Sequence, residues 1–127
     1  MAAAGRERPP IDWDSLTFSF TETDRMFVAN GSWEDGWSEG RMVDFQPLNL
    51  SPAACVLNYG QGLFEGMKAR RTPDGKITLF RPEMNARRAA EGARRLVMPE
   101  VSESMFIKAV KKVAEENKRW VPPTRKG

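Results

Sequence analysis

The stretch EGMKARRTPDGKITLF, residues 65–80, carries the clearest structural signal in the chain. Within it, residues 72–75 (TPDG) separate two runs that suit β-strands. In such a turn proline presets the backbone angle of the second position, aspartate hydrogen-bonds back to the backbone, and glycine accepts a positive φ. The stretch therefore predicts a β-hairpin.

A helix is predicted directly after this hairpin, from Pro82 to about Val97. Proline suits the first turn of a helix, and Glu83 complements the positive end of the helix dipole. Gly92 weakens such a helix without breaking it, and the helix has to stop before Pro99.

A second helix is predicted to begin at Ser102, because serine is a favourable N-cap. Its apolar residues recur at helical spacing and form one stripe, while lysines and glutamates occupy the opposite face. The stripe comprises Met105, Phe106, Ala109, Val110, Val113 and Ala114. Trp120 and the two prolines that follow it are expected to end this helix.

The N-terminal half shows strand and loop signals. Residues 24–31 contain a short apolar run that closes in an Asn-Gly pair, which is typical of hairpins. Residues 32–40 are rich in glycine, tryptophan and acids and predict a loop, whereas residues 41–50 predict another strand that Pro47 limits. Strands followed by helices predict an α+β fold, with an antiparallel sheet and helices on one face.

With 127 residues, the chain has the length of one domain. Its net charge is +3, yet residues 1–60 carry −5 and residues 61–127 carry +8. This asymmetry indicates either an anionic ligand on the C-terminal half or solvated helix faces. The absence of histidine excludes Ser-His-Asp and Cys-His catalysis and most zinc sites, so no metal site is predicted. Cys55 is the single cysteine, and no apolar run approaches the ~20 residues that span a bilayer.

Helix arginines and a glycine-containing segment are the candidates for chemistry. An arginine fork can bind phosphate, although solvated surface arginines explain the same pattern. The four arginines are Arg87, Arg88, Arg94 and Arg95. Residues 59–66 (YGQGLFEG) lack the third glycine of a phosphate-binding fingerprint. Tyr59 fits a packed core residue as well as a binding residue, and Glu65 has no second carboxylate beside it at helical spacing.

Three ordered motifs resemble branched-chain amino-acid aminotransferases, especially the plant members. They are residues 57–69 (LNYGQGLFEGMKA), residues 79–82 (LFRP) and residues 85–88 (NARR). The resemblance covers about residues 13–123 and implies the small α+β domain of a fold-type-IV pyridoxal-phosphate enzyme. It implies the small domain over residues 13–120 and the start of an interdomain linker over residues 121–127, while residues 1–12, which contain Pro9 and Pro10, predict a flexible tail.

The resemblance also implies roles for individual residues. Arg88, which ends the N-x-x-R motif, would contact the phosphate of pyridoxal phosphate, whereas Arg87 does not occupy the matching position. Tyr59, Phe64 and Phe18 would line the pocket for the substrate side chain. The implied reaction passes the amino group of leucine, isoleucine or valine to 2-oxoglutarate in a homodimer, without nucleic-acid or membrane partners.

One departure from the family concerns catalysis. The family's Schiff-base lysine lies in the C-terminal domain, beyond Gly127, and no lysine of this chain matches its motif. We therefore expect no catalytic residue here and no activity from this chain alone. The expected compartment is the cytoplasm, or a plastid or mitochondrion if a transit segment is missing from the chain.

Two kinds of alternative stay open. Within the fold type, the chain could belong to a D-amino-acid aminotransferase or an aminodeoxychorismate lyase, although residues 57–69 disfavour both. From another class, it could be a non-catalytic basic interaction domain that binds nucleic acid through its helix arginines and lysines.

Overall fold

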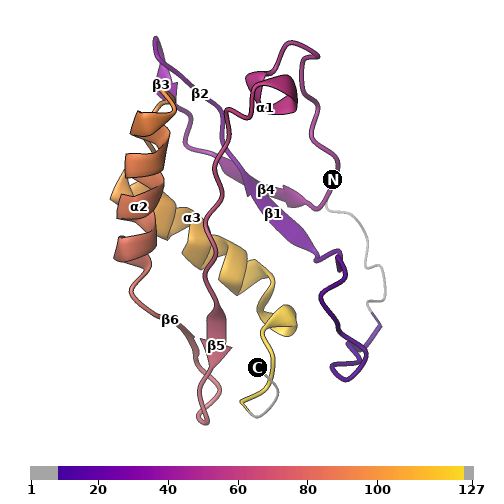
Figure 1. The fold of residues 1–127 in the computed structure, drawn as a ribbon. Helices are drawn as coiled ribbons and strands as arrows, with labels where there is room; N and C mark the ends of the chain where they lie inside the picture. Colours follow the sequence, from indigo (N-terminus) through magenta and orange to yellow (C-terminus); the bar gives the residue numbers. More distant parts are fainter. Residues whose placement is uncertain (1–8, 125–127) are drawn as a thin grey trace.

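Figure 1 shows the computed structural model, which describes residues 9–124. The predicted tail (residues 1–12) and linker (residues 121–127) therefore fall partly outside the described residues. A long N-terminal hairpin, a shorter second hairpin and two main helices make up the fold. The segment between the two hairpins contains a short helix, α1 (Cys55–Asn58), which the sequence analysis did not predict.

The N-terminal half forms one interrupted hairpin. β1 (Arg25–Val28) pairs antiparallel with β4 (Arg41–Asp44), and β2 (Gly31–Ser32) pairs antiparallel with β3 (Gly36–Trp37). The hairpin indicated by the Asn-Gly pair is confirmed, but the chain reverses only at residues 33–35. Pairing continues past Asn30, because its C=O accepts the N–H of Ser38 at 2.8 Å. The stretch predicted as a loop, residues 32–40, therefore contains β3.

A bulge interrupts this hairpin at Gly40. Ala29 and Asn30 of the first strand lie opposite residues 38–40 of the return strand, so the return strand has one extra residue. Gly40 has a φ of +70°, and a Cβ atom added there would lie 2.3 Å from Cζ of Phe27. Glycine is required on both counts, and a bulge of this kind increases the local twist of the hairpin.

The hairpin predicted within residues 65–80 is confirmed. β5 (Ala69–Arg71) pairs antiparallel with β6 (Ile77–Leu79). Gly75 has a φ of +83° and donates its N–H to the C=O of Thr72 at 2.9 Å, while the Thr72 hydroxyl bonds the Asp74 carboxylate. Gly75 thus takes the positive φ predicted for it, whereas the Asp74 carboxylate accepts its hydrogen bond from the Thr72 hydroxyl and not from the predicted backbone group.

The first main helix, α2 (Pro82–Arg95), begins at the predicted proline but ends two residues before Val97. Val97 takes a left-handed φ of +54°, so it cannot continue the helix. The N–H groups of Val97 and Met98 donate to the carbonyls of Arg94 and Ala93, respectively. These two bonds close the helix in the Schellman arrangement, with valine in the place that glycine usually takes.

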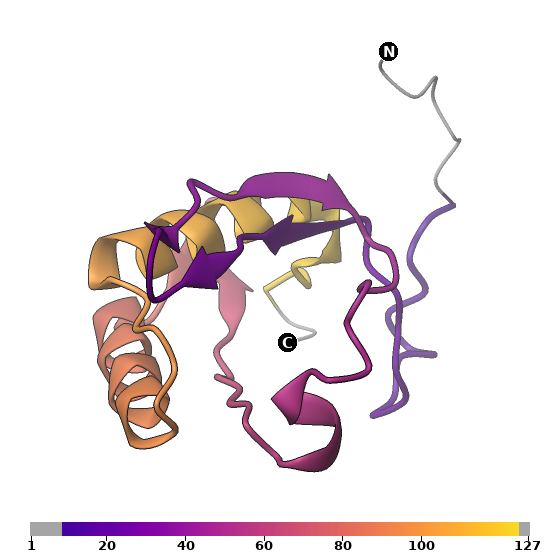
Figure 2. The ribbon, with the colours of Figure 1, turned by 90° about the horizontal axis from the view of Figure 1, so that it is seen from above.

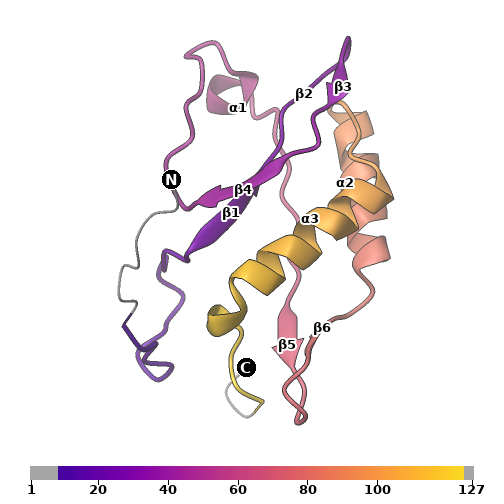
Figure 3. The ribbon, with the colours of Figure 1, turned by 180° about the vertical axis from the view of Figure 1, so that it is seen from behind.

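The second main helix, α3 (Glu103–Glu116), begins at the predicted cap, where Oγ of Ser102 accepts the N–H of Met105. Its predicted apolar stripe is half-buried, and the helix packs against β1 and α2. Figure 3 shows α3 running diagonally across the molecule. A short 3-10 turn, η1 (Lys118–Trp120), follows it. None of the helices within residues 9–124 is long and apolar enough to cross a membrane.

The predicted α+β class with antiparallel strands is confirmed, but the single predicted sheet is wrong. The described strands form three separate two-stranded sheets, because the β1–β4 and β5–β6 ribbons share no ladder. In the view from above, the β1–β4 hairpin lies in the upper part of the molecule, and α2 and α1 lie below it (Figure 2). The two ribbons are therefore connected through helix packing and loops.

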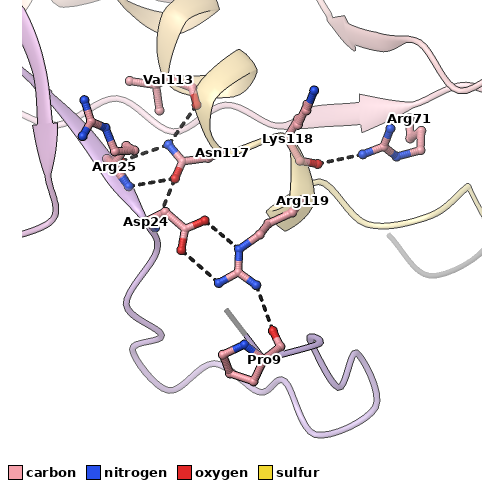
Figure 4. A network of polar contacts seen from close by, with 8 residues as sticks. All are labelled: Pro9, Asp24, Arg25, Arg71, Val113, Asn117, Lys118 and Arg119. Atoms are coloured by element: carbon pink, nitrogen blue, oxygen red, sulfur yellow. Dashed lines mark hydrogen bonds and ion pairs between the residues drawn. The ribbon is translucent and has the colours of Figure 1, made fainter. Parts of the chain in front are cut away.

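A polar network joins the start of β1 to the end of α3 (Figure 4). The buried Asn117 side chain accepts the N–H groups of Asp24 and Arg25 at 3.2 and 2.9 Å. Its amide donates to the carbonyls of Arg25 and Val113, both at 2.9 Å. Arg119 holds the Asp24 carboxylate through two hydrogen bonds of 2.6 and 2.9 Å. One buried asparagine therefore connects segments that lie 92 residues apart.

Much apolar surface of this chain is exposed. The chain exposes 10294 Å², whereas a compact monomer of 14.4 kDa exposes about 6,800 Å². The exposed side chains include Phe18, Phe20, Tyr59, Phe64 and Phe80. Such a surface is typical of polypeptide that packs against further protein.

Candidate functional site

Arg88 on α2 makes a bidentate contact with the segment that precedes β5. Its Nε and one Nη donate to the two carboxylate oxygens of Glu65, both at 2.6 Å. Asn85, one turn earlier on α2, donates to the same carboxylate at 2.8 Å and to the C=O of Gly66 at 3.1 Å. Because residues three apart share a helix face, the N-x-x-R spacing lets both side chains reach this segment.

The electrostatics of this cluster fix the charge of Glu65. Only 10% of the Glu65 side chain is exposed, against 66% of the Arg88 side chain. Hydrogen bonding from Arg88 lowers the pKa of Glu65, burial opposes that shift, and the Asn85 amide adds to it. Glu65 in turn raises the pKa of Arg88. The pair is therefore ionised at neutral pH, and Nη1 of Arg88 has no hydrogen-bond partner within residues 9–124.

Arg87 contacts a different element from Arg88. Its Nε donates to Glu103 at 3.2 Å, which joins α2 to the first turn of α3. The other two candidate arginines form ion pairs as well, Arg94 with Glu100 and Arg95 with Glu91. Among the four, Arg88 is the one that reaches the glycine-containing segment.

Contacts along α2 position this segment. Gly60 has a φ of +65°, and Gln61 donates to the C=O of Leu96 at 2.8 Å. Leu63 lies over Gly92, where an added Cβ atom would be 3.4 Å from the leucine Cδ2. The glycine that weakens α2 thus lies where the segment passes over the helix, and these contacts bring Glu65 to Arg88.

Comparison with known proteins identifies plant aminotransferases as relatives, although no family model matches the chain. A methionine aminotransferase of Arabidopsis thaliana is 49% identical over 92% of this chain. A chloroplastic branched-chain amino acid aminotransferase of Humulus lupulus is 50% identical over 95%, and a mitochondrial one of Arabidopsis thaliana is 46% identical over 95%. The chain matches the N-terminal part of the plant branched-chain aminotransferases. It spans 33%, 30% and 32% of the length of these three relatives.

The structure does not gather the aromatic residues that the aminotransferase resemblance assigns to the substrate pocket. Tyr59 and Phe64 are 86% and 92% exposed, and Phe18 is fully exposed. An apolar groove of about 550 Å³ lies between the two hairpins and α3, and none of these three side chains lines it. Their assignment to the substrate pocket of an aminotransferase therefore stays a prediction.

Sequence reasoning missed the partners of Glu65. The sequence places no second carboxylate beside Glu65, whereas the structure provides a guanidinium and an amide from α2. One signal was available, because Asn85 and Arg88 lie three residues apart on a predicted helix and must share a face. Which segment that face meets depends on the path of the chain, and no local pattern encodes it.

Proposed function

We propose that this chain forms the N-terminal part of an aminotransferase that passes the amino group of leucine, isoleucine or valine to 2-oxoglutarate. The observation that carries this proposal is the match to plant branched-chain aminotransferases at 46% and 50% identity over 95% of the chain. The Arg88–Glu65–Asn85 cluster supports it, because all three residues belong to the motifs that resemble the family.

Arg88 fits the phosphate of pyridoxal phosphate. Its guanidinium is two-thirds exposed, Glu65 fixes its orientation, and its Nη1 is available to an anion. An arginine fork binds phosphate oxygens through charge-assisted hydrogen bonds. When bound, pyridoxal phosphate supplies the electron sink that amino transfer needs. Glu65 acts as a positioning residue because it holds the Arg88 guanidinium, and Asn85 in turn holds the Glu65 carboxylate.

Tyr59, Phe64 and Phe18 are proposed to line the pocket for the substrate side chain. Their exposure leaves them free to contact a ligand or the rest of the enzyme. Aromatic walls suit a branched aliphatic side chain, because burial of apolar surface supplies its binding energy.

The catalytic step itself is assigned to the part of the enzyme that corresponds to the region of the relatives that this chain does not span. We place the catalytic lysine there and expect no amino transfer from this chain alone. Residues 13–120 would belong to the small domain of a fold-type-IV enzyme, residues 121–127 would lead into the linker, and two copies of the whole enzyme would form a homodimer. The chloroplastic and mitochondrial names of the relatives favour one of these organelles over the cytoplasm.

The test uses a joined protein, in which this chain is fused to the remaining part of the chloroplastic Humulus lupulus relative. Amino transfer from leucine is the functional readout, and its absence would reject the proposed function. Arg88→Ala should weaken pyridoxal phosphate binding by roughly 10- to 100-fold, because a hydrogen bond to a charged group contributes about 1.5–3 kcal/mol. The quenching of tryptophan fluorescence by pyridoxal phosphate measures the affinity. Arg87→Ala is the control and should leave the affinity unchanged, because Arg87 pairs with Glu103. Equal losses in the two variants would reject the assignment of Arg88.

Methionine is a second candidate substrate, because one relative is named a methionine aminotransferase and is 49% identical to this chain. Leucine and methionine can be compared as amino donors for the joined protein. We expect the higher kcat/KM with leucine, and a higher kcat/KM with methionine would select the second candidate.

A further inference from the structure

We propose that Gln61 is a positioning residue for the substrate pocket, because it fastens the segment that carries Phe64 to the C-terminal end of α2. The inference rests on the proposed function and extends it to a residue outside the groups assigned to cofactor and substrate. Residues 59–66 form this segment, which lies between α1 and β5 (Figure 1). Its contacts with α2 are ordered along the helix.

Three side chains of the segment contact α2 in an order antiparallel to the helix. The Gln61 amide donates to the C=O of Leu96, at the C-terminal end of α2, at 2.8 Å. Leu63 lies over Gly92, one turn earlier, where an added Cβ atom would be 3.4 Å from the leucine Cδ2. The Glu65 carboxylate accepts its hydrogen bonds from the first half of the helix. The segment is therefore held at both ends and in the middle.

The lengths of the segment and of the helix match between the two end contacts. From Arg88 to Leu96 an α-helix rises by about 12 Å. From Glu65 back to Gln61 an extended chain covers about 13 Å. Each end of the segment therefore lies level with its partner on α2, so both contacts form together without compressing the segment or leaving slack in it.

The segment turns alternate side chains toward α2. Successive side chains of an extended chain point to opposite sides, and the exposure of the segment follows this rule. Gln61 and Glu65 are half-buried, whereas Phe64 between them is 92% exposed. On the side away from α2, Cγ2 of Val56 in α1 lies 3.0 Å from the position of a Cβ atom added at Gly62. Phe64 shares that side with Gly62, so it points away from the helix to which its neighbours are bound.

The end of α2 leaves a carbonyl available to Gln61. The last carbonyls of a helix have no partner inside the helix and need one outside it. Val97, with its left-handed φ of +54°, prevents a further turn that would use the carbonyl of Leu96. Within residues 9–124, the Gln61 amide is the hydrogen-bond partner of that carbonyl. Loss of this amide would release one end of the segment while the Glu65 end stays bound.

The two ends of the segment have different consequences for the enzyme. The Glu65 end orients Arg88, which is assigned to the cofactor phosphate. The Gln61 end restrains the backbone that leads to Phe64, which is assigned to the substrate side chain. Release of Gln61 therefore changes the shape of the pocket and leaves the phosphate contact in place.

Discrimination between two amino donors by the joined protein tests the proposal. Leucine extends far into a branched-chain pocket, whereas 2-aminobutyrate, with an ethyl side chain, reaches less of it. Gln61→Leu should lower the ratio of kcat/KM for leucine to kcat/KM for 2-aminobutyrate by roughly 3- to 10-fold, the factor that one hydrogen bond contributes. Its affinity for pyridoxal phosphate should not change. An unchanged ratio would overturn the inference, because a loss of folded enzyme lowers both kcat/KM values alike.

Two further variants serve as controls. Gln46→Leu makes the same substitution at an exposed position outside the segment and should keep the ratio. Gln61→Lys retains a donor, and its positive charge suits the C-terminal end of a helix, so it should recover much of the lost discrimination. A ratio as low in the Gln61→Lys protein as in the Gln61→Leu protein would contradict the role of the hydrogen bond.

A measurement without activity separates this inference from the proposed function. In NMR spectra of this chain alone, we expect a nuclear Overhauser effect between the Leu63 methyl protons and the α-protons of Gly92, since the two groups are in contact. Gln61→Leu should weaken this effect severalfold, and Gln46→Leu should retain it. Full intensity in the Gln61→Leu protein would overturn the inference and leave the proposed function standing. A weakened effect, together with a joined protein that transfers no amino groups, would reject the proposed function and still show that Gln61 positions the segment.

Discussion

Arg87 and Arg88 follow one another on α2, yet their side chains contact different elements. Arg88 holds Glu65 before β5, and Arg87 holds Glu103 at the start of α3. One arginine therefore has a place in the candidate site and its neighbour joins two helices. Substitutions at the acidic partners can separate these two roles.

Glu65→Gln should lower the free energy of unfolding near neutral pH, and its difference from the unmodified chain should vanish in acid. Arg88 lowers the folded-state pKa of Glu65 below the ordinary value of about 4.3. As the pH falls, the unfolded chain binds a proton first, so the stabilisation is lost as the pH passes down through the folded-state pKa. Urea denaturation of both proteins between about pH 7 and pH 3 measures this. A difference that stays constant over this range would contradict the pairing.

Asn117→Ala should lower the free energy of unfolding by about 3 kcal/mol, because it leaves several buried backbone groups without partners. The buried amide makes four hydrogen bonds, two of them to Arg25. Asn58→Ala, at the exposed end of α1, is the control and should change stability by less than about 0.5 kcal/mol. Thermal denaturation compares the two, and similar effects would show that the network adds no stability.

Single residues could be predicted from the sequence only where a motif contains them. The N-x-x-R motif indicated Arg88, but its partner Glu65 lies 23 residues away in sequence and required the fold. Asn117 carried no signal, because an asparagine after a helix is common and its role depends on a strand 92 residues earlier.

At the scale of elements, two glycines of the N-terminal hairpin have the same backbone angle but different surroundings. Gly36 and Gly40 both have a φ of +70°. A Cβ atom at Gly36 would meet no described atom within 4 Å, whereas one at Gly40 would clash with Phe27. Gly36 is required only for its positive φ, whereas Gly40 is required both for its positive φ and because a side chain there would overlap the Phe27 ring.

The variants Gly36→Ala and Gly40→Ala should differ in stability by the energy of that clash. We expect Gly36→Ala to cost about 1–2 kcal/mol, the energy of a left-handed alanine, and Gly40→Ala to cost a further 1–3 kcal/mol or so from overpacking. Chemical denaturation of the two variants measures the difference. Equal losses would show that Phe27 moves aside freely.

Elements were predictable where their signals are local. The TPDG turn, Pro82 at the start of α2 and Ser102 before α3 each act through atoms within a few residues. The bulge at Gly40 and the division into separate sheets were not predictable, since both depend on which strand lies alongside. The end of α2 was missed because Val97 adopts a left-handed φ that its type disfavours.

At the scale of the whole molecule, the positive charge of the C-terminal half does not produce a free basic face on α2. Its four candidate arginines each pair with a carboxylate. The sequence correctly indicated the α+β class, because the order of strands and helices is a property of the whole chain. The extent of exposed apolar surface was not predictable, since 40% hydrophobic residues is an ordinary composition.

Binding of duplex DNA by the arginines of α2 should be weak and should depend little on salt, because arginines that already pair with carboxylates release few counterions. We expect the slope of log K against log salt concentration to be shallower than about −2, as fluorescence anisotropy at several salt concentrations would show. A slope of about −5 or steeper would favour the alternative of a basic interaction domain that binds nucleic acid.

The Asn117 network has a consequence for the order of events during protein synthesis. The start of β1 obtains its buried partner only when a residue 92 positions later has left the ribosome. At ordinary rates of translation that delay lasts roughly 5–20 s. During this interval the N-terminal hairpin is a nascent segment with an open edge and exposed phenylalanines, which makes it a natural substrate for chaperones that act on growing chains.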